Sequence, residues 1–333
     1  MTDTAGKKIA VLTSGGDAPG MNAAVRAVVL VGISCGADVY GIYNGYKGLM
    51  EGDLRQFSAK DVSDLSRKGG TVLGSARSKE FMTEEGFAQA LRVIKGYDLD
   101  GLVVVGGDGS LHGAQRLSES GVKCMGIPAS IDNDIAYTDY SIGVDTAQDT
   151  IIEAIDKIKD TASSHRRGFV IEVMGRAHGF LALATGVACG AEMVILPGDD
   201  ITNPERQAQI VDEVSRYYVR KKPNFICVLA EGASGPGCSA VDILAELISR
   251  AGYDCRKTIL GHVQRGGTPT CNDRNLATIM GFAATKALLE GDTGKMVGVS
   301  GREVLLTPFE DVFAADMDLP QEFLDKVRLL SVY

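Results

Sequence analysis

The sequence of 333 residues lacks the usual signs of a structural metal site or a disulfide framework. Its seven cysteines are dispersed, no two of them are spaced as C-x-x-C, and its four histidines also lack ligand spacing. A structural zinc site is therefore not expected, because such sites use Cys and His at close, regular spacing. Dispersed cysteines in apolar contexts instead indicate reduced thiols, and so a cytoplasmic protein.

Long hydrophobic runs and an excess of basic residues are missing too. The most apolar window, residues 180–196, is rich in small side chains and contains Glu192, which predicts a buried helix and strand rather than a membrane span. The N-terminus does not show the charged-then-apolar pattern of a signal peptide. The net charge of -9 argues against non-specific binding to nucleic acid. We therefore expect neither a membrane nor a nucleic acid as a partner.

Two common nucleotide-binding motifs are absent. No G-x-G-x-x-G occurs, which excludes the dinucleotide fingerprint. Gly15 and Gly20 have the glycine spacing of a P-loop, but Met21-Asn22 stands where that motif requires Lys and Ser or Thr. What is present is a strand at 9–12, a glycine turn and then a helix, an order that directs backbone N–H groups at a phosphate.

The length predicts two domains of roughly 150 residues each. Short apolar runs, such as 101–105 and 169–173, alternate with amphipathic helices such as the one carrying Ile151 and Ile155. This alternation predicts an α/β fold: two Rossmann-like domains with mainly parallel sheets covered by helices, and an active site in the cleft between them. The domains are expected to exchange segments, with the larger at 1–143 plus 261–305 and the smaller at 144–260 plus 306–333.

Polar or glycine-rich clusters follow most of the predicted strands. Gly106–Ser110 comes directly after the strand at 101–105, and its three glycines and one acid suit a bulky anion together with its metal ion. A plain tight turn needs only one or two of these residues. Because ligands bind at the carboxyl ends of strands in open α/β sheets, we expect the site there. Similar clusters follow later strands at Met174–Arg176, Ala230–Gly232 and Gly261–Gly267.

The stretch Pro128–Asp134 follows another short apolar run. Asp132 and Asp134 are separated by one residue, with the hydroxyl of Ser130 just upstream. One carboxylate could accept a proton while the other helps to hold a metal ion. The alternative is an Asx-rich turn whose side chains bond their own backbone. On this stretch alone both interpretations stay open.

Six motifs, in order, resemble those of the 6-phosphofructokinase family, from Lys8 to about Gly301. They are LTSGGDAPGMNAAVR, GGTVLGSAR, VVVGGDGS, PASIDNDI, EVMGRAHG and ILGHVQRGGTP. The family transfers the γ-phosphoryl group of ATP to the 1-hydroxyl of fructose 6-phosphate, the committed step of glycolysis. The resemblance implies this activity, with Mg²⁺ as the cofactor. It also implies that the larger domain binds the nucleotide, whereas the smaller binds the sugar phosphate and an effector.

The resemblance implies a role for each matching residue. Asp132 is the base that takes the hydroxyl proton, and Ser130 and Arg176 lie near the transferring group. Asp108 and Asp134 serve the Mg²⁺ site. The ATP-binding residues are Gly15, Arg77, Gly107, Asp108, Gly109 and Ser110. The sugar-phosphate residues are Ser130, Asp132, Arg167, Met174, Gly175, Arg176, Glu231, Arg256, His262 and Arg265.

In this family Arg167 and Arg256 reach in from a neighbouring subunit, so the resemblance implies a homotetramer whose sugar-phosphate site is shared between subunits. The neighbouring Arg166 leaves an off-by-one assignment open. His262, taken by itself, could be a structural histidine. The other histidines are interpreted as structural or surface groups: His112, His165 and His178.

Two positions separate ATP users from pyrophosphate users in this family. Pyrophosphate enzymes resemble GGDDS and PKTIDND, in which the added Asp crowds the α-phosphate and the added Lys supplies charge near the small donor. Gly109 and Ala129 occupy these positions here, which favours ATP. A pyrophosphate-dependent enzyme and a kinase of another sugar phosphate are the alternatives. A non-catalytic regulatory subunit is disfavoured because the acids at 108, 132 and 134 are retained.

Several positions depart from the family pattern. Ala129 and Ser130 stand where Gly and Thr are usual, and Met82 stands where an Arg commonly reaches the nucleotide phosphates, with Lys79 as a candidate replacement. The bacterial effector site is matched only in part, since Leu30 and Ala59 replace basic residues while Arg26 and Glu192 are present. The resemblance implies regulation by ADP or phosphoenolpyruvate, and this partial match weakens that expectation.

Overall fold

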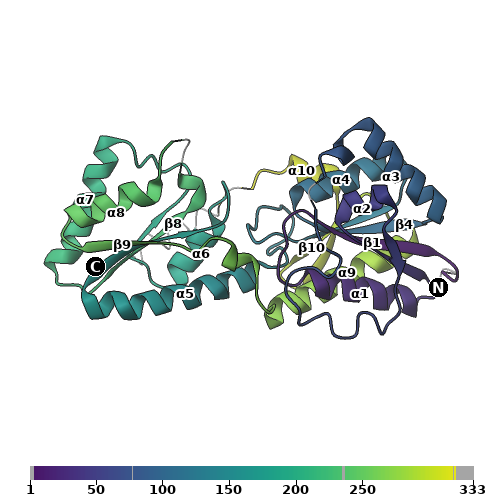
Figure 1. The fold of residues 1–333 in the computed structure, drawn as a ribbon, viewed down its shortest axis with the longest axis horizontal. Coiled ribbons are helices and arrows are strands. Elements are labelled where there is room, and N and C mark those ends of the chain that lie inside the picture. Colours follow the sequence, from purple (N-terminus) through teal and green to yellow (C-terminus); the bar gives the residue numbers. More distant parts are fainter. Residues whose placement is uncertain (1–3, 77, 235–236, 318, 320–333) are drawn as a thin grey trace. The chain divides into compact units, whose positions relative to one another are not determined.

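The computed structural model describes residues 4–76, 78–234, 237–317 and 319. Within them the chain forms two compact units (Figure 1). The first contains the residues up to Thr146 together with Arg265–Asp316, and the second contains Ala147–Gln264. The predicted α/β class, with mainly parallel sheets covered by helices, is confirmed.

The first unit is built on a seven-stranded sheet in the order β11-β10-β5-β4-β1-β2-β3. Only the two edge strands, β3 and β11, run antiparallel to their neighbours. All six residues of β4 are buried, as is typical of a parallel strand covered on both faces. The strands are β1 (Lys8–Ser14), β2 (Asp38–Ile42), β3 (Leu54–Gln56), β4 (Gly101–Gly106), β5 (Cys124–Pro128), β10 (Lys295–Ser300) and β11 (Glu303–Pro308).

Helices cover both faces of this sheet (Figure 1). On one face α1 (Met21–Ser34) packs against α9 (Cys271–Glu290). The other face buries a core that includes Leu12, Val104 and Phe309. The helices on that face are α2 (Gly45–Glu51), α3 (Glu84–Tyr97), α4 (Asp108–Glu119) and α10 (Phe309–Ala314), and the 3₁₀ helix η1 (Glu80–Met82) precedes α3.

The second unit contains a four-stranded, all-parallel sheet in the order β7-β8-β6-β9. Its strands are β6 (Arg167–Val173), β7 (Met193–Ile195), β8 (Phe225–Ala230) and β9 (Asp254–Ile259). Apolar residues of α7 (Pro204–Val219) and α8 (Ala240–Arg250) form its main core with the sheet. The remaining elements are α5 (Val144–His165), α6 (Phe180–Ala188), η2 (Glu231–Ala233) and η3 (Gly261–Arg265).

The ends of the units differ in detail from the sequence-based division. The expected end of the larger domain at residue 305 falls inside β11, which pairs with β10 as far as Pro308, and the first unit continues to Asp316. Likewise β9 begins at Asp254, whereas the sequence predicts an extended segment only at 258–260. β9 is an exposed edge strand, and its polar residues interrupt the apolar run that marks a buried strand. Residues 320–333 lie outside the described residues.

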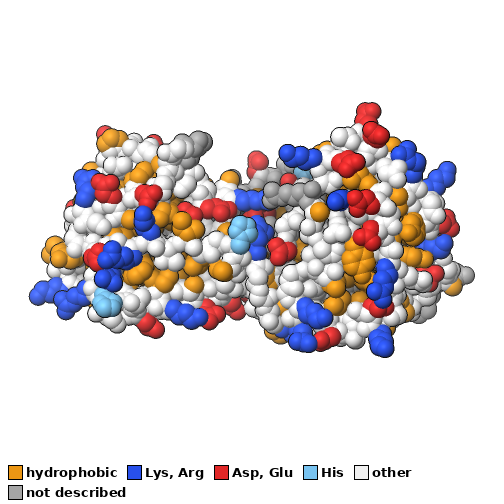
Figure 2. Space-filling model, viewed as in Figure 1, with side chains coloured by type: hydrophobic (Ala, Val, Ile, Leu, Met, Phe, Trp, Pro, Cys, Tyr) orange, Lys and Arg blue, Asp and Glu red, His pale blue; other side chains and the backbone are white. Residues whose placement is uncertain are grey.

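The remaining sequence-based expectations concern the state of the cysteines, membrane-spanning helices and the charge of the surface. All seven cysteines are free, and burial raises the pKa of the Cys124 and Cys227 thiols, as expected for unreactive core cysteines. Among the described residues, no helix combines the length and apolar character needed to cross a membrane. On the face shown in Figure 2, side chains of both charge signs are scattered among hydrophobic ones.

Candidate active site

Three turns of the first unit begin side by side at the carboxyl ends of its central strands. In the strand register Ser14 pairs with Gly106, and Gly106 pairs with Pro128. The turns after β1, β4 and β5 therefore start next to one another. The strand order also changes direction between β1 and β4, with β2 and β3 on one side and β5 on the other. Such a switch point is the usual ligand-binding position in an open α/β sheet.

The turn after β1 needs glycine at position 15, because its backbone has a positive φ. Gly15 has a φ of 87°, which favours glycine, and its carbonyl oxygen accepts a hydrogen bond of 2.5 Å from Ser75 Oγ. The Arg265 guanidinium lies against the same turn and donates to the Asp17 carbonyl oxygen at 3.3 Å. Arg265, which was expected to bind the sugar phosphate, thus also braces the turn expected to bind nucleotide.

The turn after β4 leads directly into α4. Gly107 is the N-cap and makes no side-chain capping bond, and Asp108 is the first residue of the helix. An uncapped N-terminus leaves backbone N–H groups available to an anion, and the helix dipole favours negative charge there. Gly109 is exposed, and a Cβ at this position would meet no heavy atom within 4 Å. This open space can accept a phosphate-bearing ligand.

The turn after β5 holds the two neighbouring acids in different environments. Asp132 is buried, with 1% of its surface exposed, and its N–H donates to Ser130 Oγ at 3.3 Å. Ser130 Oγ in turn donates to Asp134 Oδ1 at 2.9 Å. Asn133 has a φ of 50° and accepts a bond of 2.9 Å from the Ser141 N–H, which fixes the turn. The stretch is therefore an Asx-rich turn that also positions two carboxylates.

The residues expected to hold Mg²⁺ suit that ion. Among the described residues, no cluster of three or more His, Cys, Asp or Glu side chains could hold a metal ion. Magnesium usually needs no such cage, because it keeps several waters and binds one or two carboxylates plus the phosphates of its substrate. The Asp108 side chain, 54% exposed, and the partly exposed Asp134 offer this donor set on adjacent turns.

In the second unit, the turns after β6 and β8 hold each other in place. The Arg176 N–H donates to Glu231 Oε1 at 2.9 Å. A Cβ on Gly232 would lie 2.1 Å from the Arg176 carbonyl oxygen, so only glycine permits this close approach. Gln264, fully buried, accepts from the Met174 N–H at 3.1 Å. Sequence reasoning missed Gln264, because a glutamine in a polar turn gives no sign of burial.

A second carboxylate lies near Glu231. Burial raises the pKa of Glu172, which is on β6, and the negative charge of Glu231 raises it further. The negative charge of Glu231 therefore makes ionisation of Glu172 less favourable. Burial and the neighbouring negative charge therefore both raise the pKa of Glu172 and favour its protonated form.

Comparison with known proteins identifies the chain. The family model described as Phosphofructokinase matches residues 8–288. The chain belongs to the phosphofructokinase family. The resemblance seen in the six sequence motifs is thereby confirmed.

Curated relatives of similar length support the same assignment. An ATP-dependent 6-phosphofructokinase of Clostridioides difficile is 48% identical over 330 residues, covering 98% of this chain and 100% of that protein. A protein of the same name from Thermotoga neapolitana is 48% identical over 326 residues, covering 98% of this chain and 100% of that protein.

Solved structures agree on the fold. The phosphofructokinase of Saccharomyces cerevisiae superposes with a TM-score of 0.86 at 38% identity, covering 98% of this chain. This chain spans 47% of the yeast chain. A pyrophosphate-dependent phosphofructokinase of Marinobacter aquaeolei gives a TM-score of 0.80 at 21% identity and covers 98% of this chain and 92% of that one, a likeness of fold alone.

The phosphofructokinase site residues expected in the second unit do not all lie at the carboxyl ends of its strands. Arg167 Nε and Arg256 NH2 both donate to Asp254 Oδ2, at 3.0 and 2.9 Å. Arg167 is the first residue of β6, whereas Met174 follows its last residue. At about 3.3 Å per residue, the Arg167 and Met174 backbones are roughly 20 Å apart. The structure brings the two arginines together but holds them away from the strand ends that carry Arg176 and Glu231.

Three further positions that the sequence singles out are His262, Arg77 and Met82. His262 is exposed on η3, and Arg77 lies outside the described residues. Met82, at the position where the family commonly has Arg, is 69% exposed. Its carbonyl oxygen and that of Phe81 accept hydrogen bonds from Arg116 NH1, which hold the backbone at this position.

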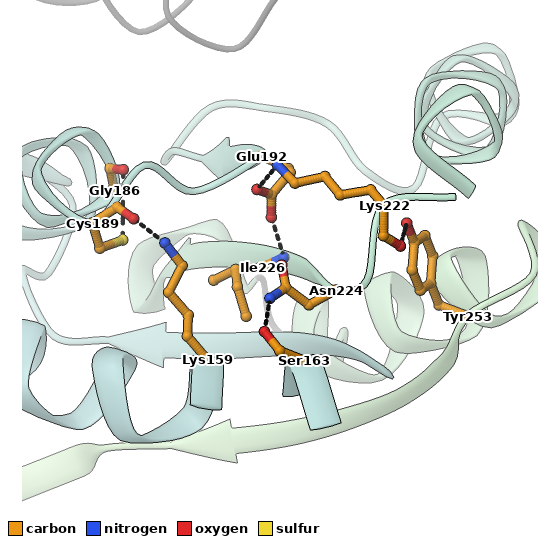
Figure 3. A network of polar contacts seen from close by, with 9 residues as sticks. All are labelled: Lys159, Ser163, Gly186, Cys189, Glu192, Lys222, Asn224, Ile226 and Tyr253. Atoms are coloured by element: carbon orange, nitrogen blue, oxygen red, sulfur yellow. Dashed lines mark hydrogen bonds and ion pairs between the residues drawn. The ribbon is translucent and has the colours of Figure 1, made fainter. Parts of the chain in front are cut away.

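Glu192, one of the two residues matching the family's effector site, is buried. Figure 3 shows the polar contacts around it. Its Oε1 accepts from Lys222 Nζ, and its Oε2 accepts from the Ile226 N–H at 2.6 Å. Lys159, from α5, donates to the Cys189 carbonyl oxygen in the same network. Both Glu192 oxygens are thus engaged within the unit.

Proposed function

We propose that the chain transfers the γ-phosphoryl group of ATP to the 1-hydroxyl of fructose 6-phosphate, giving fructose 1,6-bisphosphate and ADP. The register of β1, β4 and β5 carries the proposal, because it places an open helix N-terminus beside a buried aspartate. Close relatives named ATP-dependent 6-phosphofructokinase support it. We further propose that the protein works in the cytoplasm.

Phosphoryl transfer asks a protein chiefly for positioning and charge stabilisation. The α4 N-terminus and the Gly15 turn supply N–H groups for the phosphates of ATP. Asp132 accepts the proton of the sugar hydroxyl as the new bond to phosphorus forms, a contribution on the order of 10²–10⁴-fold. Arg176 balances the charge on the transferring group. Glu231 and Met174 orient the sugar.

Mg²⁺, when bound, would neutralise the charge that builds up on the phosphates. Asp108 and Asp134 are the residues that would hold it. Their different surroundings suit separate tasks: Asp134 is tied to Ser130 Oγ at 2.9 Å, whereas Asp108 is half-exposed at the helix terminus.

The space at Gly109 supports ATP rather than pyrophosphate as the donor. A Cβ added here would have no heavy atom within 4 Å, so the position leaves room for the rest of a nucleotide beyond its terminal phosphates. Ala129 is buried and uncharged, so no lysine ammonium is present at this position to attract a small anionic donor. A donor-by-acceptor matrix tests this: purified protein with Mg²⁺ should make fructose 1,6-bisphosphate faster from ATP than from pyrophosphate. Absence of product with both donors would rule out the proposed reaction.

The sugar-phosphate site is proposed to be shared between subunits of a homotetramer. Within one chain, Arg167 and Arg256 lie far from the strand ends that carry Arg176, which supports their reaching the site of a neighbouring copy. The exposed β9 edge, with Ile259 63% exposed, supports an interface on this side of the second unit.

Subunit mixing tests the shared site. Asp132→Asn removes the base, and Arg256→Ser removes a phosphate ligand. If the site is shared, hybrid oligomers contain some sites with both native groups. Co-expressed, differently tagged chains should then show more activity at limiting fructose 6-phosphate than the weighted sum of the two parents. Activity equal to that sum would exclude sharing, and a monomeric mass in solution would exclude the assembly.

A further inference from the structure

His112 contacts the carboxylate expected to hold Mg²⁺. It lies four residues after Asp108 on α4, so both side chains are on the same face of the helix. Its Nδ1 is 3.1 Å from the Asp108 carbonyl oxygen and 3.4 Å from Asp108 Oδ1. Because both facing atoms are acceptors, this contact requires a hydrogen on Nδ1.

The imidazole ring is itself held in place. Phe313 of α10 stacks on it with ring centroids 3.6 Å apart and an angle of 20° between the planes. Phe313 also stacks with Phe309, whose side chain is buried in the core of the first unit. A line of contacts therefore runs from the core through Phe309 and Phe313 to His112, and from there to Asp108.

An aspartate with 54% of its side chain exposed would otherwise sample several rotamers. The His112 contact at Oδ1 reduces the number of favourable Asp108 rotamers, and a carboxylate has a second oxygen that can bind a ligand. Residues that orient a metal-binding group from behind commonly change metal affinity by 10–100-fold when replaced. The exposed setting of His112 places its expected effect at the low end of that range.

We propose that His112 is a positioning residue for Asp108, with Phe313 holding the imidazole, and that it sets the affinity for the magnesium form of the nucleotide. This inference rests on the proposed function and names the residues that tune its metal site. Sequence patterns alone place His112 among the structural or surface histidines.

Calorimetric titration with a non-hydrolysable ATP analogue, with and without Mg²⁺, tests the proposal. The quantity compared is the factor by which Mg²⁺ tightens binding. His112→Phe keeps an aromatic ring against Phe313 but removes the donor, and should reduce that factor about tenfold, with metal-free binding unchanged. His112→Asn places an amide N–H near the position of Nδ1 and should restore the factor to within about threefold of the native value.

Phe313→Leu should have a smaller effect in the same direction, because the donor stays but the ring is less constrained. Glu290→Gln is the matched control: it removes an exposed i,i+4 ion pair with Lys286 on α9 and should leave the factor unchanged. Thermal unfolding of each variant verifies that the fold is retained.

The outcomes separate this inference from the proposed function. The inference is overturned if His112→Phe leaves the Mg²⁺ factor unchanged, if it weakens binding equally with and without Mg²⁺, or if Asn fails to restore it. If the native protein binds the magnesium nucleotide and His112 behaves as expected, but no fructose 1,6-bisphosphate forms, only the proposed reaction fails.

Discussion

The two units use carboxylates in opposite ways. In the second unit, Glu192 is 7% exposed, with one oxygen paired to Lys222 and the other to a backbone N–H. In the first unit, the Asp108 side chain is 54% exposed and is contacted by His112. A buried carboxylate must find its partners inside the fold, since leaving it unpaired costs several kcal/mol. An exposed carboxylate at a helix terminus can exchange water for a metal ion at little cost.

From this contrast we expect exposed carboxylates at strand ends to serve the reaction and buried, paired carboxylates to serve stability. Asp132 combines features of the two cases: it is buried, like Glu192, yet it is part of a strand-end turn beside the open α4 terminus. Replacing each acid by its amide should therefore separate the three roles, with activity, stability and metal affinity responding to different residues.

Asp132→Asn should have the largest effect. The amide cannot accept the hydroxyl proton, so kcat should fall by about 10²–10⁴-fold while the KM for fructose 6-phosphate changes little. Steady-state kinetics with both substrates varied measure this. A kcat within threefold of the native value would remove Asp132 from the role of base.

Glu192→Gln should come second, as a loss of stability. The amide keeps an acceptor for the Ile226 N–H but leaves the Lys222 ammonium without its counter-ion. Breaking a buried pair typically costs 3–5 kcal/mol, and we expect about 2–3 kcal/mol because Lys222 can partly reach water. Its side chain is 21% exposed.

Urea unfolding measures that loss, with Asp108→Asn as the matched control. The control removes an exposed charge and should change stability by no more than about 0.5 kcal/mol. Equal losses in the two variants would contradict the contrast between the units. In the double variant Glu192→Gln/Lys222→Met, part of the lost stability should return, because the unpaired ammonium is gone.

Gly109→Asp should have an intermediate effect on donor choice. The new carboxylate would extend into the open space in front of α4, where it repels the α-phosphate of ATP. We expect kcat/KM for ATP to fall about tenfold, roughly 1.4 kcal/mol, with no loss of stability because the added Cβ meets nothing. Gly109→Ala is the control and should keep ATP use. An unchanged preference between ATP and pyrophosphate would show that this position does not select the donor.

Glu172→Gln should give the smallest effect, seen only as a dependence on pH. A carboxyl group whose pKa is raised on folding binds its proton more tightly in the folded state. Stability is therefore lost as pH rises from the ordinary glutamate pKa of about 4.3 through the raised value. Since burial and Glu231 raise the pKa of Glu172, the Gln variant should become more stable relative to the native protein between pH 4 and 7, by a few tenths of a kcal/mol. Urea unfolding at both pH values checks the sign, and a relative loss would contradict it.

Much of this could be predicted from local sequence. The buried strands β1, β4 and β8 are continuous apolar runs, and the glycine-rich turns after β1 and β4 identify themselves by composition. The edge strand β9 could be predicted only at its last residues, because Asp254, Arg256 and Lys257 are polar and exposed. Burial of Glu192 could not be predicted, since its partner Lys222 is 30 residues away in the sequence.

The sequence by itself determined which chemistry is present: strand-end turns with phosphate-binding glycines, two acids in one short stretch, and motifs sufficient for the family. Tertiary structure alone decided what those groups do to one another. The strand register sets the turns after β1, β4 and β5 side by side, and the opposite ends of β6 separate Arg167 from Arg176. Packing of α10 against α4 brings Phe313 onto His112, although the two residues are far apart in the chain. Side-chain type is a local property, whereas burial, pairing and orientation depend on residues that only folding brings near.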